Sequence, residues 1–481
     1  MTGGTAEGRE GGRTEGRQGG TLVRGRMRVV TAVLLLSALP AFPPSASAQA
    51  LRVPTDTFTL LNGLKVAVQE DHSAPLVAVN VWYHVGSGRE VAGRSGFAHL
   101  FEHMMFQGSK DVEKGGHFGV VQEAGGTLNG STNSDRTNYY EMVPSNYLEQ
   151  VLWLEADRMG FLLDAFSQGK LDNQRDVVKN ERRQNYENAP YGLASIRLGE
   201  MLYPEGHPYH APTIGYQADL TAASPEDVAG FFRQWYVPNN ASLVIAGDVK
   251  PAEVRRLVAR YFGDIPKGPN PPTVKPMPVT LTADQRDVME DRVTLARVSL
   301  VWPTVERWNA DEDALDILGS ILGQGKSSRL YERLVYREQA AQSAGANQFS
   351  RPQAGQFQVT VMAREGTSLS QMEREVYEEI ARLAKDGPTP AEMARARNGN
   401  EARSVYQLQT LLGKADRINQ YLTERGTPDY FNQELAHYAA VTPADVQRVA
   451  QTYINNRPHI ILSVVPNGHR ELAAQAPEVH P

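Results

Sequence analysis

The fold is decided by a stretch that occurs twice: SPEDVAGFFRQWYVPNNASLVIA at residues 224–246 and TPADVQRVAQTYINNRPHIILSVV at residues 442–465. Ser224 and Thr442 are favourable helix N-caps, and each is followed by Pro at the first helical position and by an acid in the first turn. In both copies the predicted helix leads through a Tyr and an Asn-Asn pair into an apolar run typical of a strand. Each copy therefore predicts a helix followed by a buried strand.

The two copies are separated by 218 residues, and a second similarity has nearly the same offset. Gln-Gly-Ser-Lys at residues 107–110 matches Gln-Gly-Lys-Ser at residues 324–327, an offset of 217. Two similarities at one offset indicate an internal repeat of domain size, and chance similarity is the alternative. The proline-rich segment 266–278 lies between the copies and predicts a stiff, extended linker.

Each half opens on segments with strand character. In the first half these are residues 57–68 and 76–84, which alternate or run apolar and contain β-branched residues. Helical patterns follow at residues 146–163 and 174–188. The sequence thus predicts an α+β protein of two homologous domains.

Length and composition exclude several classes of protein. The chain has 481 residues, 41% of them hydrophobic and 22% charged, which is ordinary for a globular protein of two or three domains. It contains no Cys, so disulfides, thiolate metal sites and a cysteine nucleophile are excluded. Any metal must be held by His, Asp or Glu. The formal charge of −6 argues against a nucleic-acid binder.

The N-terminal 48 residues have the features of an export signal. A polar Gly/Arg/Glu-rich extension is followed by Arg residues at 24, 26 and 28, an apolar run at 29–39 and a small-residue cleavage site before Gln49. The apolar run is shorter than the roughly 20 residues that span a bilayer. We interpret residues 1–48 as an N-terminal extension and cleavable signal peptide, with Met1 or Met27 as the start. A retained membrane anchor is the alternative.

The chemistry is concentrated in the segment FAHLFEHMMF at residues 97–106. On a helix, His99 and His103 lie one turn apart on the same face, and Glu102 lies beside them. Two such imidazoles can hold one Zn²⁺, and an adjacent carboxylate can take a proton from bound water. The order H-x-x-E-H is the inverted zincin pattern. Two histidines packed in a helix core beside an unrelated acid are the alternative.

A catalytic zinc site needs a third protein ligand. The helical segment 174–188 offers Glu181. Spacing alone does not separate Glu181 from Glu155 or Glu187, and an acid on a solvated helix face is the common fate of Glu.

Three segments together resemble the M16 metallopeptidases, the group of pitrilysin, insulin-degrading enzyme and mitochondrial processing peptidase. They are HLFEH at residues 99–103, VVKNE at residues 177–181, and the strand-like run from Asn129 to Tyr139. The resemblance extends from about residue 55 to 466 and is strongest for short bacterial two-domain members. It implies one Zn²⁺ per chain held by His99, His103 and Glu181, with Glu102 as the general base. Glu181 stands 78 residues after His103, at the separation typical of the family's third ligand.

The resemblance also implies an architecture and a substrate site. Each domain is expected to be a mainly antiparallel sheet packed with helices, and the two domains together to form half of a clamshell chamber. The run at 125–129 is expected to form an edge strand that pairs with a substrate peptide, with Asn129 and Phe106 contacting the peptide. A turn residue and a core aromatic are the plain alternatives. The expected segments are the signal region 1–48, a catalytic zinc-binding domain 49–265, a linker 266–282, a second domain without a metal site 283–470, and a tail 471–481.

Two departures from the family pattern stand out. Gln174 occupies a position seven residues before Glu181 where many members have a supporting Glu. The repeat offset places Asp316, Gly319 and Ser320 opposite His99, Glu102 and His103, so the second domain is not expected to bind zinc.

The second domain also lacks a pair expected from the resemblance. Self-sufficient members supply an Arg and a Tyr after an S-S-R-L run, and this chain has Val335 and Gln342 there. Tyr336 and Arg337 are nearby, in the wrong order and spacing. We therefore expect a heterodimer in which a related M16 subunit supplies the Arg and the Tyr.

The sequence thus predicts a periplasmic or secreted zinc-dependent metalloendopeptidase that hydrolyses peptides or unfolded polypeptides, without stable membrane insertion or a nucleic-acid partner. A non-catalytic peptide-binding or scaffold subunit of an M16-type complex is the first alternative. A zinc hydrolase of a non-peptide amide is the second.

Overall fold

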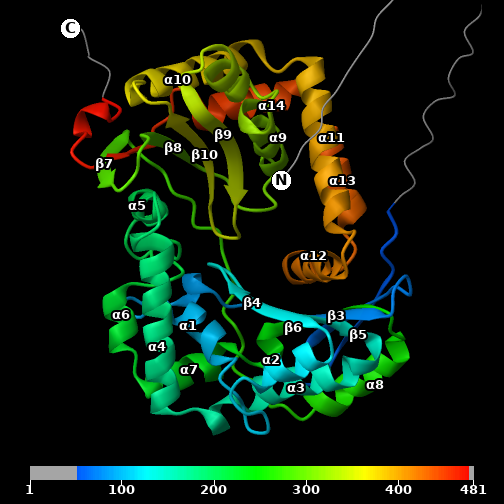
Figure 1. Ribbon diagram of the computed structural model, residues 1–481. Helices are drawn as coiled ribbons and strands as arrows, with labels where there is room; N and C mark the ends of the chain where they lie inside the picture. The colour runs from blue at the N-terminus through cyan, green and yellow to red at the C-terminus, as the bar shows by residue number, and fades with distance from the viewer. Residues whose placement is uncertain (1–50, 476–481) are drawn as a thin grey trace, which may run out of the picture. The chain divides into compact units, whose positions relative to one another are not determined.

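The computed structural model describes residues 51–475, whose strands form two sheets (Figure 1). The first sheet contains β1 (Thr55–Thr59), β2 (Lys65–Glu70), β3 (Leu76–Tyr83), β4 (Thr127–Thr132), β5 (Thr137–Pro144) and β6 (Ala241–Gly247). The second contains β7 (Gln285–Asp291), β8 (Arg297–Thr304), β9 (Ala341–Ser350), β10 (Gly355–Ala363) and β11 (Ile460–Pro466). The predicted signal peptide at 1–48 and the end of the tail at 476–481 lie outside the described residues.

Helices follow the same division. The first half contains α1 (Phe97–Met104), α2 (Gly116–Glu123), α3 (Leu148–Phe161), α4 (Gln168–Arg182), α5 (Gly192–Leu202), α6 (Gln217–Ala222), α7 (Pro225–Trp235) and α8 (Pro251–Phe262). The second contains α9 (Glu312–Gly323), α10 (Leu369–Asp386), α11 (Pro390–Gln407), α12 (Leu411–Glu424), α13 (Phe431–Ala440) and α14 (Pro443–Val449). The segment between α8 and β7 is neither helix nor strand.

The two sheets have the same topology. The first is ordered β1-β2-β6-β3-β5-β4 and the second β7-β11-β8-β10-β9, so that of the strands described here β1 alone lacks a counterpart. In each sheet one pair is parallel, β2 with β6 and β7 with β11, and the other pairs are antiparallel. The predicted α+β class with two homologous domains is confirmed, and the duplication is visible in the strand order itself.

The two predicted helix starts are formed as expected. The Ser224 hydroxyl accepts the N–H of Asp227 at 3.1 Å, and the Asp227 carboxylate accepts the N–H of Ser224 in return. Thr442 and Asp445 make the same reciprocal pair at the start of α14. This capping box satisfies two N–H groups that a helix end otherwise leaves unpaired.

Two predicted elements differ in detail. Residues 57–68 were expected to be one strand, but they belong to β1 and β2, joined by a turn in which Gly63 has φ of 93°. The Asn62-Gly63 pair favours such a turn, because Gly adopts positive φ without a steric cost. The predicted helix 174–188 starts earlier, at α4 with Ser167 as its N-cap, and ends at Arg182 in a π-helical turn over Arg183–Glu187.

Each half supplies one helix to the sheet of the other. On the first sheet, α12 covers the face opposite to α3 and α8, and Ala415, Ile418 and Leu422 pack on Ala78 and Val244. On the second sheet α5 does the same, since Leu198 and Leu202 pack with Ile460 and Leu462. α5 and α12 are repeat-related, so the exchange is reciprocal. Both sheets are therefore covered on both faces.

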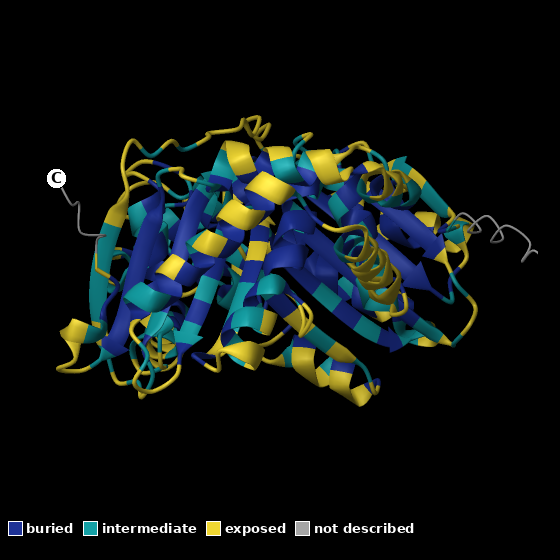
Figure 2. Ribbon diagram, turned by 90° about the horizontal axis from the view of Figure 1, so that it is seen from above, coloured by how far each residue is buried: buried dark blue, intermediate teal, exposed yellow. Residues whose placement is uncertain are grey.

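The pattern of burial follows from this exchange. Figure 2 shows buried residues along the strands of both sheets and exposed residues on the outer sides of the helices. In β6 every residue is buried, as is typical of a strand with helices on both faces. Among the described residues, no helix combines the length and the apolar character needed to cross a membrane.

Candidate metal centre

Helix α1 carries the two histidines, and its N-terminus is fixed by a carboxylate. Gly96 precedes the helix with φ of 85°, a left-handed conformation that Gly adopts readily. The Glu90 carboxylate accepts the N–H groups of Gly96 at 2.8 Å and of Ala98 at 2.7 Å. It thereby satisfies two donors that the first turn would leave free. The first turn, which contains His99, is thus held in place.

The structure brings His99, His103 and Glu181 together, with their potential ligand atoms all within 4.8 Å of one another. Glu181 Oε2 lies 3.7 Å from His99 Nε2 and 3.3 Å from His103 Nε2. Two ligand atoms of a tetrahedral zinc site with bonds of about 2.0–2.2 Å are roughly 3.3–3.6 Å apart. The three groups therefore fit a zinc ion in both chemistry and spacing.

The charges of these groups suit a cation. Burial lowers the pKa of His99 to about 4, so its imidazole is neutral at pH 7, the form that binds a metal. A hydrogen bond from His103 lowers the pKa of Glu181, which keeps it ionised. The Nδ1 atom of His99 is buried and has no hydrogen-bond partner among the described residues.

The two competing acids are engaged elsewhere. Glu155 is fully buried and accepts a hydrogen bond from the guanidinium of Arg158. The same guanidinium donates a hydrogen bond to Glu141 at 3.1 Å. The Glu187 carboxylate accepts a hydrogen bond from Arg182 Nε at 3.2 Å. The structure therefore places Glu181, and neither alternative, beside the histidines.

Glu102 lies next to this cluster and is oriented by a hydroxyl. Thr132 at the end of β4 donates its Oγ1–H to Glu102 Oε2 at 2.7 Å. Burial raises the pKa of Glu102. Gly130 in the same strand leaves room for it, because a Cβ there would lie 3.1 Å from Glu102 Cγ and 3.2 Å from Phe106 Cε2. A partly buried carboxylate beside two imidazoles is well placed to move protons.

The two predicted substrate contacts lie on and beside β4. Among the strands of residues 51–475, β4 is at the edge of the first sheet and pairs with β5 alone. Asn129 is exposed, and its amide oxygen accepts the N–H of Gly130 at 2.8 Å. Phe106 is half-buried between Phe118, with ring centroids 4.9 Å apart, and Tyr139 at 5.6 Å. An edge strand presents unpaired backbone groups to which a peptide can add.

The repeat-related place in the second half has a different chemistry. Asp316, Gly319 and Ser320 lie on α9, and Asp316 accepts the hydroxyl of Tyr438 at 2.6 Å. Asp316, Gly319 and Ser320 cannot form the His-His-Glu arrangement. Val335 packs against the second core, and Gln342 is exposed on β9.

Sequence reasoning missed two residues that support the centre. Thr132 has no local pattern that marks it as a partner of Glu102. Arg158 is fully buried beneath the rings of Tyr139 and Phe106, 4.2 and 5.3 Å from their centroids. In the sequence, the signal that could have identified Arg158 is the position of an Arg on the buried face of an amphipathic helix. Gln174 is buried on α4 and donates to Asn173 at 2.9 Å.

Comparisons with known proteins give one consistent picture. The family described as Insulinase (Peptidase family M16) matches residues 65–201, and the Peptidase M16 inactive domain matches residues 222–400. The Zinc protease PqqE of Helicobacter pylori is 28% identical over 439 residues, which cover 90% of this chain and 96% of the relative. A probable mitochondrial-processing peptidase subunit beta of Arabidopsis thaliana is 25% identical over 423 residues, 86% of this chain and 78% of the relative.

A solved structure agrees with these sequence matches. A protease from Helicobacter pylori superposes with a TM-score of 0.80 and 26% identity, covering 86% of this chain and all of that one. The two family matches follow one another along the chain, the second beginning at residue 222 within the first half and extending into the second. The chain therefore belongs to peptidase family M16, as a two-domain member.

Proposed function

We propose that this protein is a zinc-dependent endopeptidase of peptides or unfolded polypeptides and the catalytic subunit of a heterodimer. The observation that carries the proposal is the convergence of His99, His103 and Glu181, with Glu102 beside them. Relatives named as zinc proteases support the same activity.

Each residue has a role in the proposed reaction. His99, His103 and Glu181 would hold one zinc ion, which supplies the Lewis acidity that activates water and polarises a peptide carbonyl. Glu102 accepts the proton of the attacking water and returns it to the leaving amine. Thr132 fixes one oxygen of Glu102 by its hydrogen bond. The free edge of β4 binds the substrate backbone as an added strand, with Asn129 and Phe106 at its side.

The proposed partner follows from what the second half lacks. Val335 and Gln342 replace the Arg and Tyr expected there, and neither can donate a charged or phenolic hydrogen bond to a developing oxyanion. A related M16 chain that carries this pair would complete the site. If the purified chain cleaves peptides at full rate as a monomer or homodimer, this part of the proposal is wrong.

The central experiment is Glu102→Gln in the full chain, assayed on a fluorogenic peptide with and without a related chain. Loss of a general base lowers rates by about 10²–10⁴-fold, so we expect hydrolysis to fall at least that far while zinc content stays at one per chain. Glu123→Gln removes an exposed acid from α2 and is the matched control. Retained hydrolysis in Glu102→Gln, with zinc confirmed, would refute the assignment.

A non-catalytic peptide-binding subunit is the second candidate, favoured by the match of residues 222–400 to the inactive M16 domain. In that case the wild-type protein would bind peptides, with or without zinc, and would cleave none in the presence of any related chain. Glu102→Gln would then bind peptide as the wild type does and show no further change.

We also propose export to the periplasm or the exterior. The basis is the sequence pattern of residues 24–48 alone. N-terminal sequencing of the protein from its native host tests this directly, because cleavage would leave Gln49 as the first residue.

A further inference from the structure

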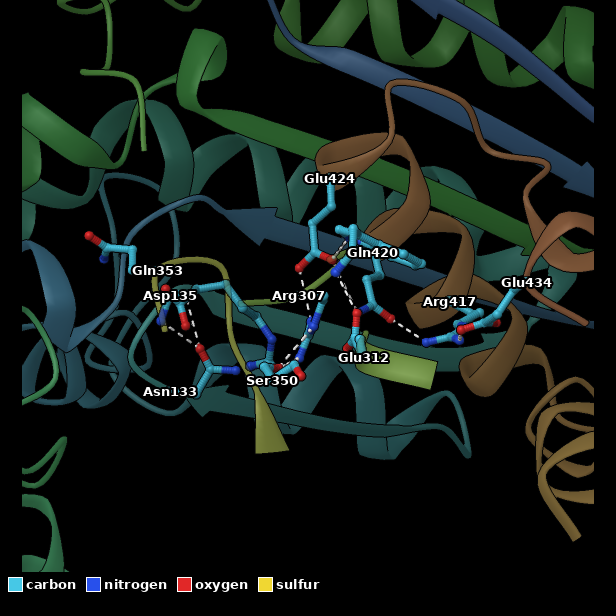
Figure 3. A network of polar contacts seen from close by, with 12 residues as sticks. Asn133, Asp135, Arg307, Glu312, Ser350, Gln353, Arg417, Gln420, Glu424 and Glu434 are labelled. Carbon is cyan, nitrogen blue, oxygen red and sulfur yellow. Dashed lines mark hydrogen bonds and ion pairs between the residues drawn. The ribbon is translucent and has the colours of Figure 1, made fainter. Parts of the chain in front are cut away.

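The repeat-related turns of the two halves contact each other. Residues 133–136 join β4 to β5, and residues 351–354 join β9 to β10, so Asp135 and Gln353 are 218 positions apart, as in the internal repeat. The Tyr209 hydroxyl donates to Asp135 at 2.7 Å and accepts the N–H of Gln353 at 3.1 Å. Figure 3 shows Asn133, Asp135 and Gln353 close together at one end of the polar network.

Arg351 joins these turns more directly. Its Nη1 donates to Ser134 Oγ at 3.2 Å and its Nη2 to the Tyr203 hydroxyl at 2.6 Å. The guanidinium lies over the ring of Tyr209, 3.8 Å from the centroid, and 5.0 Å from that of Tyr203. Both tyrosines are buried, so this planar group is held by stacking and by directed hydrogen bonds together.

The first-half turn is itself stiff. The Asn133 side chain accepts the N–H groups of Asp135 at 2.8 Å and of Arg136 at 2.9 Å. The backbone oxygens of Asn133 and Ser134 accept N–H groups from Ser87 and Gly88, at 3.1 and 2.8 Å. Thr132 directly precedes this turn and stands two residues before Ser134.

Thr132 is the residue that hydrogen-bonds Glu102, at 2.7 Å. Arg351 of the second half is thus linked to the carboxylate proposed as the general base by its hydrogen bond to Ser134, the two residues of backbone back to Thr132, and the hydrogen bond of Thr132. The second half, which has no metal-binding residues at the repeat-related place, reaches the site by this path.

We propose that Arg351 is a positioning residue for the reaction: it holds the turn at 133–136 so that Thr132 keeps Glu102 in its working orientation. The catalytic part of this inference rests on the proposed peptidase function, and the structural part does not. A merely adhesive role, in which Arg351 only joins the two halves, is the competing explanation.

The test compares four variants of the full chain, with its partner where activity requires one. Arg351→Ala removes the contact, Arg351→Lys keeps the charge and loses the planar fork, and Thr132→Val removes the hydroxyl. Lys414→Ala is the matched control, because Lys414 pairs with Asp71 of the first half away from the turn. Small misplacements of catalytic groups cost roughly 10–100-fold. We expect kcat to fall that far for the first three, with KM within twofold and zinc content unchanged, and to stay within twofold for Lys414→Ala.

Two further measurements separate positioning from adhesion. The double variant Arg351→Ala/Thr132→Val should be no slower than the slower single variant, because both changes break one path; multiplied losses would overturn the inference. Hydrogen exchange over residues 127–144 should accelerate in Arg351→Ala and not in Lys414→Ala. Unchanged exchange there overturns the inference even if the protein cleaves no peptide, whereas inactivity of the wild type refutes only the proposed function.

Discussion

Helices α1 and α9 occupy the same place in two sheets of the same topology, yet they fill the space beside the edge strand in opposite ways. In the first half the edge strand has no side chain at Gly130, and the space is filled by Glu102 of α1 and by Phe106, which follows the helix. In the second half the helix has Gly319 at the position related to Glu102, where a Cβ would lie 3.3 Å from the Cα of Asn347. The first half thus has reactive side chains beside its edge strand β4, whereas in the second half the backbone of α9 lies directly against the edge strand β9.

The duplicated fold therefore does not determine the chemistry. The strand order, the capping boxes and the exchanged helices are common to both halves. What differs is a few side chains on one helix and one glycine on the facing strand.

The largest effect is expected from the metal ligands. His103→Ala removes an imidazole from the His-His-Glu cluster, and we expect loss of bound zinc and of peptide hydrolysis below detection. Metal content by mass spectrometry and a peptide assay on the same sample measure both. Ser320→Ala, at the repeat-related position, should change neither. A His103→Ala protein that retains zinc would contradict the proposed ligand set.

The next effect is expected from the glycine of β4. Gly130→Val places a branched side chain where a Cβ alone would already approach Glu102 and Phe106 closely. Because the carboxylate must shift, we expect a fall in kcat of about 10²-fold with zinc retained. Activity and zinc content of the purified variant are the measurements.

The counterpart of that change is Gly319→Ala in α9. The added methyl group crowds β9, while Ala favours a helix over Gly by about 1 kcal/mol, so the net change in unfolding free energy should stay within about 1 kcal/mol. Denaturant unfolding and the peptide assay should both give near wild-type values. A large loss of activity would mean that the second half shapes the site through α9 as well as through the turn at 351–354.

Much of this arrangement could be predicted from the sequence, because local patterns carry it. Ser224 and Thr442 mark two helix starts by capping chemistry, and their common offset predicts the duplication. The spacing of His99 and His103 predicts a shared helix face. The choice of Glu181 over Glu155 did not follow from spacing. It needed the resemblance, and the structure accounts for it by the ion pair that holds Glu155 on Arg158.

The remainder depends on contacts between distant segments. An amphipathic pattern shows that α5 and α12 bury one face, but it does not show that each does so on the sheet of the other half. Nothing in the local sequence distinguishes Thr132 or Arg351 from other strand and turn residues. Their roles follow from the contacts of Thr132 with Glu102 and of Arg351 with Ser134, which only the fold creates. The Asn62-Gly63 turn was missed because the strand pattern on either side continues across it.

A further effect, on stability alone, concerns the two exchanged helices, each of which pairs a basic residue with an acid of the other half. Lys414 on α12 pairs with Asp71, and Arg197 on α5 with Asp287 at 2.6 Å. The first pair is the more buried, with side chains 19% and 17% exposed against 42% and 32%. Exposed pairs contribute little, so the first should stabilise the fold more than the second.

The pH dependence of unfolding tests this ranking. The hydrogen bond from Lys414 lowers the pKa of Asp71 from 3.8 to about 2. A carboxylate with a lowered pKa stabilises the folded state fully above its unfolded pKa, and this contribution is lost as pH falls from about 4 towards 2. Asp71→Asn should therefore lower the unfolding free energy by about 1 kcal/mol at pH 7 and by much less near pH 2. Asp287→Asn should cost less at pH 7. Equal losses of unfolding free energy in the two variants would contradict this ranking. They would show that the burial of an ion pair does not increase its contribution and that the exchanged helices are held mainly by their apolar faces.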